Sequence, residues 1–452
     1  MANTSNNKQS SKSSDKPFID QIKEKADALA KYGGFDLLES AIDDVQNLNP
    51  ERKARRKMFL TENNKKQERE ALQKILELWS DTLKSGDDII AQVQAADDKA
   101  KESEDVLKKN LKLALDETRE LETSYRSVAL FFKNTDQPSL KNVSIINAEL
   151  DQLTDLDNTR FFDHIQEELV SKYDRLDLRE NYSLMVLPGY LGSKSVVDKW
   201  AKVAHDNKVT LITDFAHLDE PDDVMEMFQS ANLASGDAYL SNTIMTCNWL
   251  VGRGKNEDVG EEDDVHVPPS GALAGKIYKT LMSQVTAGKK HGGLSEVDGV
   301  RFDLKKSEIA NLENLGLVPM VNEYGKVMAF SAKTLFNGEN LGLQTYSVVR
   351  VFDYVTKVLM DFLNRRAFEN FDARTRKEIH SQIVRFLDGI TGPGKLIENF
   401  EVKRFEQDPN QKDRIHLDVR LKPYFPAKNF LIKMDGQRGD EGAEWDTDYE
   451  QQ

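Results

Sequence analysis

The sequence is nearly free of cysteine, since Cys247 is the only one among its 452 residues. A single cysteine excludes an intramolecular disulfide and a zinc site built from several thiolates. Cys247 lies in an apolar run with Ile244, Met245, Trp249 and Leu250. We therefore interpret it as a small, buried hydrophobic side chain.

Long apolar runs and excess positive charge are missing too. No stretch approaches the roughly 20 apolar residues of a membrane span, and residues 1–16 lack the apolar core of a secretory signal. We expect a cytoplasmic protein that begins with a disordered tail at 1–16. With 62 Lys and Arg against 77 Asp and Glu, the net charge is −15. Nucleic acid and anionic membranes are not expected as partners, because both attract cationic proteins.

Familiar catalytic motifs are missing as well. The segment GALAGK at 271–276 resembles a phosphate-binding loop, but it is one residue short and Ile277 replaces the magnesium-binding hydroxyl. Residues 189–192 follow an apolar strand, yet they lack the third glycine and the acidic residue of a dinucleotide fingerprint. The seven histidines include no pair spaced to hold one metal. We predict no catalytic residues, no cofactor and no metal.

The chain is long enough to bury two or three cores, and its first third shows helical periodicity. Residues 17–135 are predicted to be helical. One helix carries Phe18, Ile22 and Leu29 and ends at Gly33. A further amphipathic helix is predicted over residues 72–83.

The most informative of these helices carries a long apolar stripe, in which residues recur at alternating spacings of four and three. This spacing keeps one seam in line, as a coiled coil requires. The seam belongs either to a helix in the core of its own domain or to an arm that packs against a partner helix. The residues of this seam are Leu107, Leu111, Leu121, Tyr125, Val128 and Phe132.

From residue 136 the pattern changes to mixed α/β, and we place a middle domain at 136–300. Residues 183–187 and 208–215 are predicted strands, and a helix capped by Ser193 lies between them, which makes one βαβ unit. Residues 252–264 are glycine-rich and then acidic, so an exposed loop is expected there.

A C-terminal domain is expected at 301–436. Residues 348–362 form one amphipathic helix, and Asp372 caps another that ends near Ile390. Residues 415–421 and 430–434 alternate as strands do. The acidic tail at 437–452 is expected to be disordered unless a partner orders it.

Residues 300–436 resemble the C-terminal part of contractile-tail sheath proteins. The segment FSAKTL at 330–335, followed by YSVVRV at 346–351, is similar to the sheath passage R-T-L … Y-x-x-V-R-R. FLDGI at 386–390 and LKPYFPAKNF at 421–430 follow in the order seen in sheath proteins. The resemblance is strongest to the large sheath subunit of type VI secretion systems (the TssC/VipB family), in a Bacteroidota-like divergent form.

The resemblance implies a non-enzymatic, structural role. Such subunits pair with a small sheath subunit of the TssB/VipA type and build a six-fold helical lattice on a baseplate. The sheath surrounds an inner tube of Hcp-like hexamers and contracts to expel it, and a ClpV-like AAA+ unfoldase recycles it. On this basis the fold is mixed α/β: a helical N-terminal region, sheath-type α/β domains and C-terminal strands that pair between subunits.

The resemblance also assigns roles to residues. The helix with Phe18, Ile22 and Leu29 would recruit the unfoldase, and Arg374, Arg376 and Lys377 would face the inner tube. The seam would contact the small subunit. A chain ending at Lys422 should fold in large part yet fail to polymerise. The strands exchanged between subunits would carry Phe400, Val402, Ile415, Leu417, Val419, Leu421, Phe430, Ile432 and Met434.

Three other functions stay open at this point. The chain could be a self-sufficient sheath protein of a phage tail or an extracellular injection machine, although a partner seam favours the two-subunit type. It could also be a nucleotide-binding enzyme built on the βαβ unit, or a helical scaffold that does not contract.

Overall fold

The computed structural model describes residues 61–84, 88–178, 181–428, 431–437 and 444–450. It divides into two compact units, Met1–Glu104 and Asp105–Gln452, each of which is described by itself. The predicted tail at 1–16 and the helix with Phe18, Ile22 and Leu29 lie outside the described residues, as does Phe430.

Two helices make up most of the described residues up to residue 134. Helix α4 (Lys66–Lys84) and helix α5 (Ile89–Asn134) confirm the helices predicted around residues 72–83 and 107–132. On α4 the apolar side chains of Ile75, Leu78 and Trp79 are exposed. Among the described residues, no helix combines the length and the apolar character needed to cross a membrane.

The second unit is built around a five-stranded sheet in the order β1-β2-β3-β7-β8. The first four strands are parallel, and β8 pairs antiparallel with β7. The predicted βαβ unit is confirmed, because α8 (Lys194–Asp206) connects β1 and β2. The strands are β1 (Leu184–Leu187), β2 (Thr210–Asp214), β3 (Thr243–Cys247), β7 (Leu317–Glu323) and β8 (Lys326–Ala329).

Both faces of this sheet are covered, since its central strands are apolar on both sides. Leu211 packs into a core with α8, α9 (Pro221–Ala231) and α12 (Lys306–Asn314). Its neighbour Ile212 packs on the other face, against α10 (Pro269–Lys279) and Leu130 of α5. Cys247 of β3 is fully buried, as predicted, and burial raises the pKa of its thiol.

Smaller elements complete the described chain. A three-stranded sheet, β5-β4-β6, joins the second core. Its strands are β4 (Leu250–Arg253), β5 (Val265–Val267) and β6 (Gly299–Val300). Further helices are α6 (Leu150–Thr154), α7 (Arg160–Tyr173), α11 (Gly288–His291) and α13 (Leu341–Gln344), with 3-10 turns at Asn63–Lys65, Gln137–Ser139 and Ala238–Asn242.

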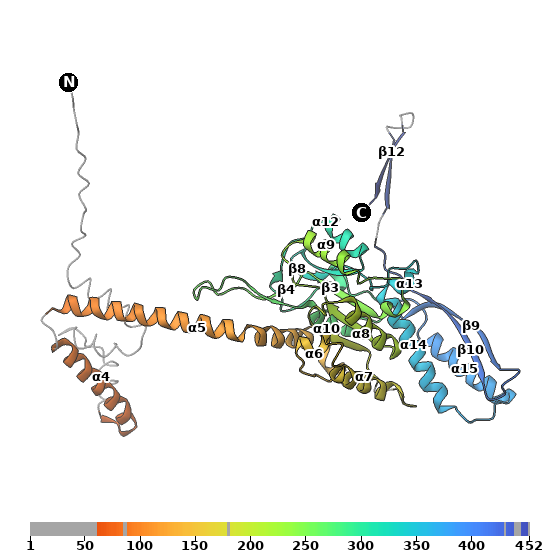
Figure 1. Ribbon diagram of the computed structural model, residues 1–452, viewed down its shortest axis with the longest axis horizontal. Coiled ribbons are helices and arrows are strands. Elements are labelled where there is room, and N and C mark those ends of the chain that lie inside the picture. The colour runs from red at the N-terminus through yellow and green to blue at the C-terminus, as the bar shows by residue number, and fades with distance from the viewer. Residues whose placement is uncertain (1–60, 85–87, 179–180, 429–430, 438–443, 451–452) are drawn as a thin grey trace. The chain divides into compact units, whose positions relative to one another are not determined.

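A third core joins two helices to a two-stranded sheet. Helix α14 (Tyr346–Arg365) and helix α15 (Ala373–Gly389) confirm the two helices predicted in this region. Asp372 caps α15 as expected, because its Oδ1 accepts a hydrogen bond from the Thr375 N–H at 2.7 Å. Strands β9 (Ile397–Gln407) and β10 (Ile415–Pro423) pair antiparallel and run alongside α15 (Figure 1). The expectation of a mixed α/β fold is confirmed.

The acidic end of the chain differs from expectation. Strand β11 (Leu431–Gln437), which contains Ile432 and Met434, pairs antiparallel with β12 (Glu444–Glu450). The prediction that residues 437–452 are disordered without a partner is therefore wrong for β12. The acidic residues there alternate with Trp445, Thr447 and Tyr449, which favour strands, and the high charge obscured this period of two.

Asp214 is a fully buried carboxylate at the carboxyl end of β2. It accepts hydrogen bonds from the Gly189 N–H at 2.9 Å, the Ser270 N–H at 2.7 Å and the Ser270 hydroxyl at 2.6 Å. The Thr246 hydroxyl donates a further bond. Asp214 therefore binds the Gly189 N–H in the turn after β1, where a nucleotide-binding enzyme would bind phosphate.

We expect Asp214 to make stability pH-dependent, because burial outweighs these bonds and raises its pKa from 3.8 to about 6. Between pH 4 and 6 the unfolded chain ionises this group and the folded chain does not, so folded stability falls as pH rises. The loss corresponds to about 3 kcal/mol. Asp214→Asn cannot ionise, so urea unfolding should show its stability relative to the wild type improving by about 2 kcal/mol from pH 4 to pH 7, since part of the loss already occurs below pH 4. A constant difference would contradict the raised pKa.

Candidate subunit interface

Helices α5 and α10 cross at two glycines. A Cβ atom added at Gly271 would lie 2.5 Å from the Ser127 carbonyl oxygen, and one added at Gly275 would lie 2.3 Å from the Phe131 carbonyl oxygen. The two glycines are four residues apart on α10, and Ser127 and Phe131 are four residues apart on α5. One turn of each helix therefore meets one turn of the other. The segment that resembled a phosphate-binding loop is thus a helix-packing surface.

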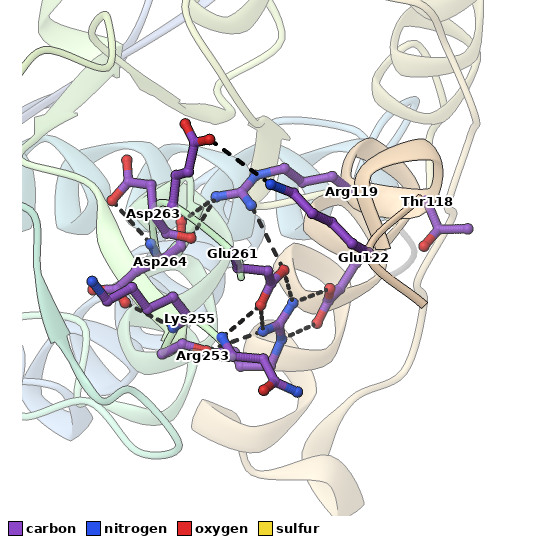
Figure 2. Close-up of polar contacts among 12 residues, drawn as sticks. Thr118, Arg119, Glu122, Arg253, Lys255, Glu261, Asp263 and Asp264 are labelled. Carbon is purple, nitrogen blue, oxygen red and sulfur yellow. Dashed lines mark hydrogen bonds and ion pairs between the residues drawn. The ribbon is translucent and has the colours of Figure 1, made fainter. Parts of the chain in front are cut away.

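A cluster of ion pairs joins α5 to the end of β4 and to the segment between β4 and β5 (Figure 2). The Arg253 guanidinium contacts both Glu122 oxygens at 3.0 Å and both Glu261 oxygens, at 2.6 and 3.0 Å. Arg126 reaches Glu122 at 2.8 Å and the Gly252 carbonyl at 2.9 Å. These bidentate contacts between Arg253 and the two carboxylates depend on the planar geometry of the guanidinium group.

Arg119 extends this cluster along α5. It donates to the Asp263 carbonyl at 3.2 Å and to the Asp264 carbonyl, and it lies 3.9 Å from Glu261. The hydrogen bond from Arg253 lowers the pKa of Glu261 to about 2 and also lowers that of Glu122. Both carboxylates are therefore ionised at neutral pH, and the cluster carries fixed charges.

The prediction of an exposed loop at 252–264 is therefore partly wrong. Arg253 belongs to β4, and the Glu261 side chain is only 2% exposed. The acidic composition suggested solvent exposure. Glu261 pairs with Arg253, which is close in the sequence, but Arg119 of α5, which binds the Asp263 carbonyl 144 residues away, could not be located from local sequence.

The predicted seam lies on the exposed side of α5. The exposed fractions are 66% for Leu107, 71% for Leu121 and 72% for Tyr125. Leu111 and Val128 are also exposed, and Phe132 is half-buried. Ser127 and Leu130, by contrast, are buried. Within the described chain the seam is thus an apolar stripe, which favours the interpretation as a surface for a partner helix.

The predicted exchange strands already pair within the chain. Leu421 lies opposite Phe400, and Val419 lies opposite Val402. These four side chains and Leu417 pack on the helices of the third core, whereas Ile415 is 41% exposed. In the part of the chain that the structure describes, neither β9 nor β10 pairs with a third strand, so their outer backbone edges are available for strand addition.

The predicted tube-facing cations lie in the first turns of α15. Arg374, Arg376 and Lys377 are exposed and form no ion pair among the described residues. Positive charge is unfavourable at a helix N-terminus because it opposes the helix dipole. Their position is therefore not explained by the stability of α15.

Three sequence models of one family match the chain in order. They are the TssC/VipB-like N-terminal region at residues 22–111, the type VI secretion system TssC/VipB central domain at 113–337, and the TssC/VipB-like C-terminal domain at 345–451. The chain belongs to the TssC/VipB family. The family suggested by residues 300–436 is confirmed. No curated protein sequence matches this TssC/VipB chain.

Two solved structures from the anti-feeding prophage share the fold of this TssC/VipB chain. The helical sheath of the anti-feeding prophage in its contracted state is 17% identical, with a TM-score of 0.51 over 69% of this chain and 81% of that chain. A chain of the anti-feeding prophage baseplate is 16% identical, with a TM-score of 0.50 over 69% of this chain and 79% of that chain. At these identities the likeness establishes the fold.

Proposed function

We propose that this chain is the large subunit of a cytoplasmic contractile sheath in a type VI secretion machine. It assembles with a small sheath subunit into a six-fold helical lattice around an inner tube and contracts to expel that tube. The observation that carries the proposal is the match of all three TssC/VipB models along residues 22–451. The exposed seam and the open edges of β9 and β10 supply surfaces for such a lattice.

The energy that drives contraction comes from differences in interface energy between the two lattices, rather than from nucleotide hydrolysis. Rigid domains dock differently in the extended and contracted lattices, and added strands keep the subunits linked during the change. Strand addition at β9 and β10 uses backbone hydrogen bonds, so it does not require the apolar side chains that already pack on α14 and α15. The exposed cations of α15 face an Hcp-like inner tube. Assembly starts on a baseplate, and a ClpV-like unfoldase recycles the contracted sheath.

Electron microscopy of the chain, expressed with and without its small subunit, tests the proposal. Tubes with cogwheel cross-sections that need both proteins are the expected result. Tubes formed by this chain alone would instead support a self-sufficient phage-like or extracellular sheath, and soluble monomers in both preparations would overturn the proposal.

The seam gives a more local prediction. Leu111→Asp with Leu121→Asp places two charges on the exposed stripe, where a partner helix would have to desolvate them. We expect the yield of co-purified small subunit to fall at least about tenfold. Lys109→Glu makes the same change of two units in net charge at an exposed position on the side of α5 away from the seam, so it should leave the yield unchanged. Equal yields from the two variants would show that the seam is not the contact.

A further inference from the structure

A cavity of about 450 Å³ lies beside α14, at the amino ends of β1 and β2. Ser183 and Thr210 mark this end of the two strands, where the Thr210 N–H donates to the Ser183 carbonyl at 3.0 Å. Helix α14 contributes Arg350, Asp353 and Lys357, which share one face of the helix because they are spaced by three and four residues. The cavity therefore lies at the end of the sheet opposite to Asp214.

Arg350 is the unusual member of this cavity. The residue is only 7% exposed, and its Nη1 atom is buried without a hydrogen-bond partner in the described chain. The guanidinium also forms no ion pair among the described residues. Burial lowers the pKa of Arg350 to about 10, against a small opposing effect of Tyr346. Buried arginines normally pair with carboxylates, because an unpaired buried charge is unfavourable.

Three lysines add positive charge to the same cavity. Lys141 and Lys208 line it and form no ion pair in the described parts of the chain. Lys357 donates to the Tyr182 carbonyl at 2.9 Å and to the Asn181 side chain, and burial lowers its pKa to about 8. None of these interactions supplies negative charge to the cavity.

Neither of the two carboxylates that line the cavity pairs with Arg350. Asp353 accepts from the Asn242 amide at 2.6 Å and interacts with the charges of Lys208 and Lys357. Asp361 accepts from the Leu178 N–H at 3.0 Å and pairs with Arg365. Four cationic side chains therefore line the cavity against two carboxylates. The arginine, which is best suited to two-pronged recognition of an anion, has no anion to recognise.

We propose that this cavity binds an oxyanion through the Arg350 guanidinium and the Lys208 ammonium. The chemistry is that of a phosphate or carboxylate group, which offers two oxygens to the guanidinium fork. Free phosphate and a carboxylate side chain of another subunit are the two sources of this chemistry. The site differs in position from a nucleotide site after β1, because that site would lie at the opposite ends of the strands.

Thermal unfolding of the full-length chain in sodium chloride, phosphate and acetate at equal ionic strength tests the proposal. We expect phosphate to raise the melting temperature by about 3 °C relative to chloride, because a ligand that binds only the folded state stabilises it. Arg350→Met should lose most of this rise, and Lys208→Met should lose part of it. Arg385→Met, on the exposed side of α15, is the matched control and should keep the rise.

The variants separate binding from general salt effects, because phosphate also stabilises proteins by exclusion from their surface. A rise that acetate produces and that Arg350→Met abolishes would identify a carboxylate of another subunit as the ligand, and a rise specific to phosphate would identify the free anion. A rise of the same size in wild type and Arg350→Met, or no rise with either anion, would overturn the proposal. If Arg350→Met does not fold, the same comparison with Lys208→Met decides.

Discussion

Gly275→Ala should lower the free energy of unfolding by about 3 kcal/mol, an unusually large effect for adding one methyl group. The new Cβ would lie 2.3 Å from the Phe131 carbonyl oxygen and 3.1 Å from the carbonyl carbon, so α5 and α10 would have to separate. Both elements belong to the second core, where Leu130 packs with Leu273. The backbone of α5 cannot rotate away as a flexible side chain would.

Urea unfolding and hydrogen exchange measure this effect. Exchange should accelerate most in residues 119–134 and in α10, because those segments lose their mutual packing. Gly389→Ala is the matched control: Gly389 also lies in a helix, but nothing lies within 4 Å of an added Cβ. That variant should be unchanged or slightly more stable, since alanine favours helix more than glycine does. Equal unfolding midpoints for the two variants would show that the helices do not cross at Gly275.

A chain that ends at Lys428 should fold normally, but the amount of polymer that it forms should fall at least about tenfold. The truncation removes β11 and β12, which pair with each other, and leaves β9 and β10 complete. It also keeps the 2.7 Å ion pair between Lys428 and Glu313. The end at Lys422 suggested by the sequence would remove Pro423, the last residue of β10. The later end therefore separates loss of assembly from damage to the third core.

Sedimentation of polymer from cells that also express the small subunit measures the outcome, and circular dichroism checks the fold. A chain ending at Glu450 retains both strands and should assemble as the full-length chain does. If the chain ending at Lys428 sediments as much polymer as the full-length chain, β11 and β12 are not required for the lattice.

Local periodicity was sufficient to predict the helices and strands whose signals lie within one element. Helices α14 and α15 show a continuous apolar stripe, and β1 and β2 are short apolar runs bounded by turn residues. The alternation of β10 was also evident, but β9 was suggested only by family resemblance. Its alternation breaks between Val402 and Phe405, where a bulge interrupts the pairing with β10.

The interior charges and the helix crossing could not be predicted locally. Asp214 appears in the sequence as the end of an apolar strand, and its burial is explained only by Gly189, Thr246 and Ser270, which lie 25 to 56 residues away. The spacing of Gly271 and Gly275 suggested an incomplete phosphate-binding loop. Their actual neighbours, two carbonyls of α5, have no sequence signature. In each case the decisive neighbour is distant in the chain.

The open edges of β9 and β10 also affect how the protein must be produced. A strand edge without a neighbour pairs with whatever strand it meets, including the same edge of an identical chain. Synthesis of this chain in excess over its partners would therefore favour aggregates held by backbone hydrogen bonds. Under the proposed function, balanced and simultaneous supply of the sheath subunits protects the cell from such aggregation.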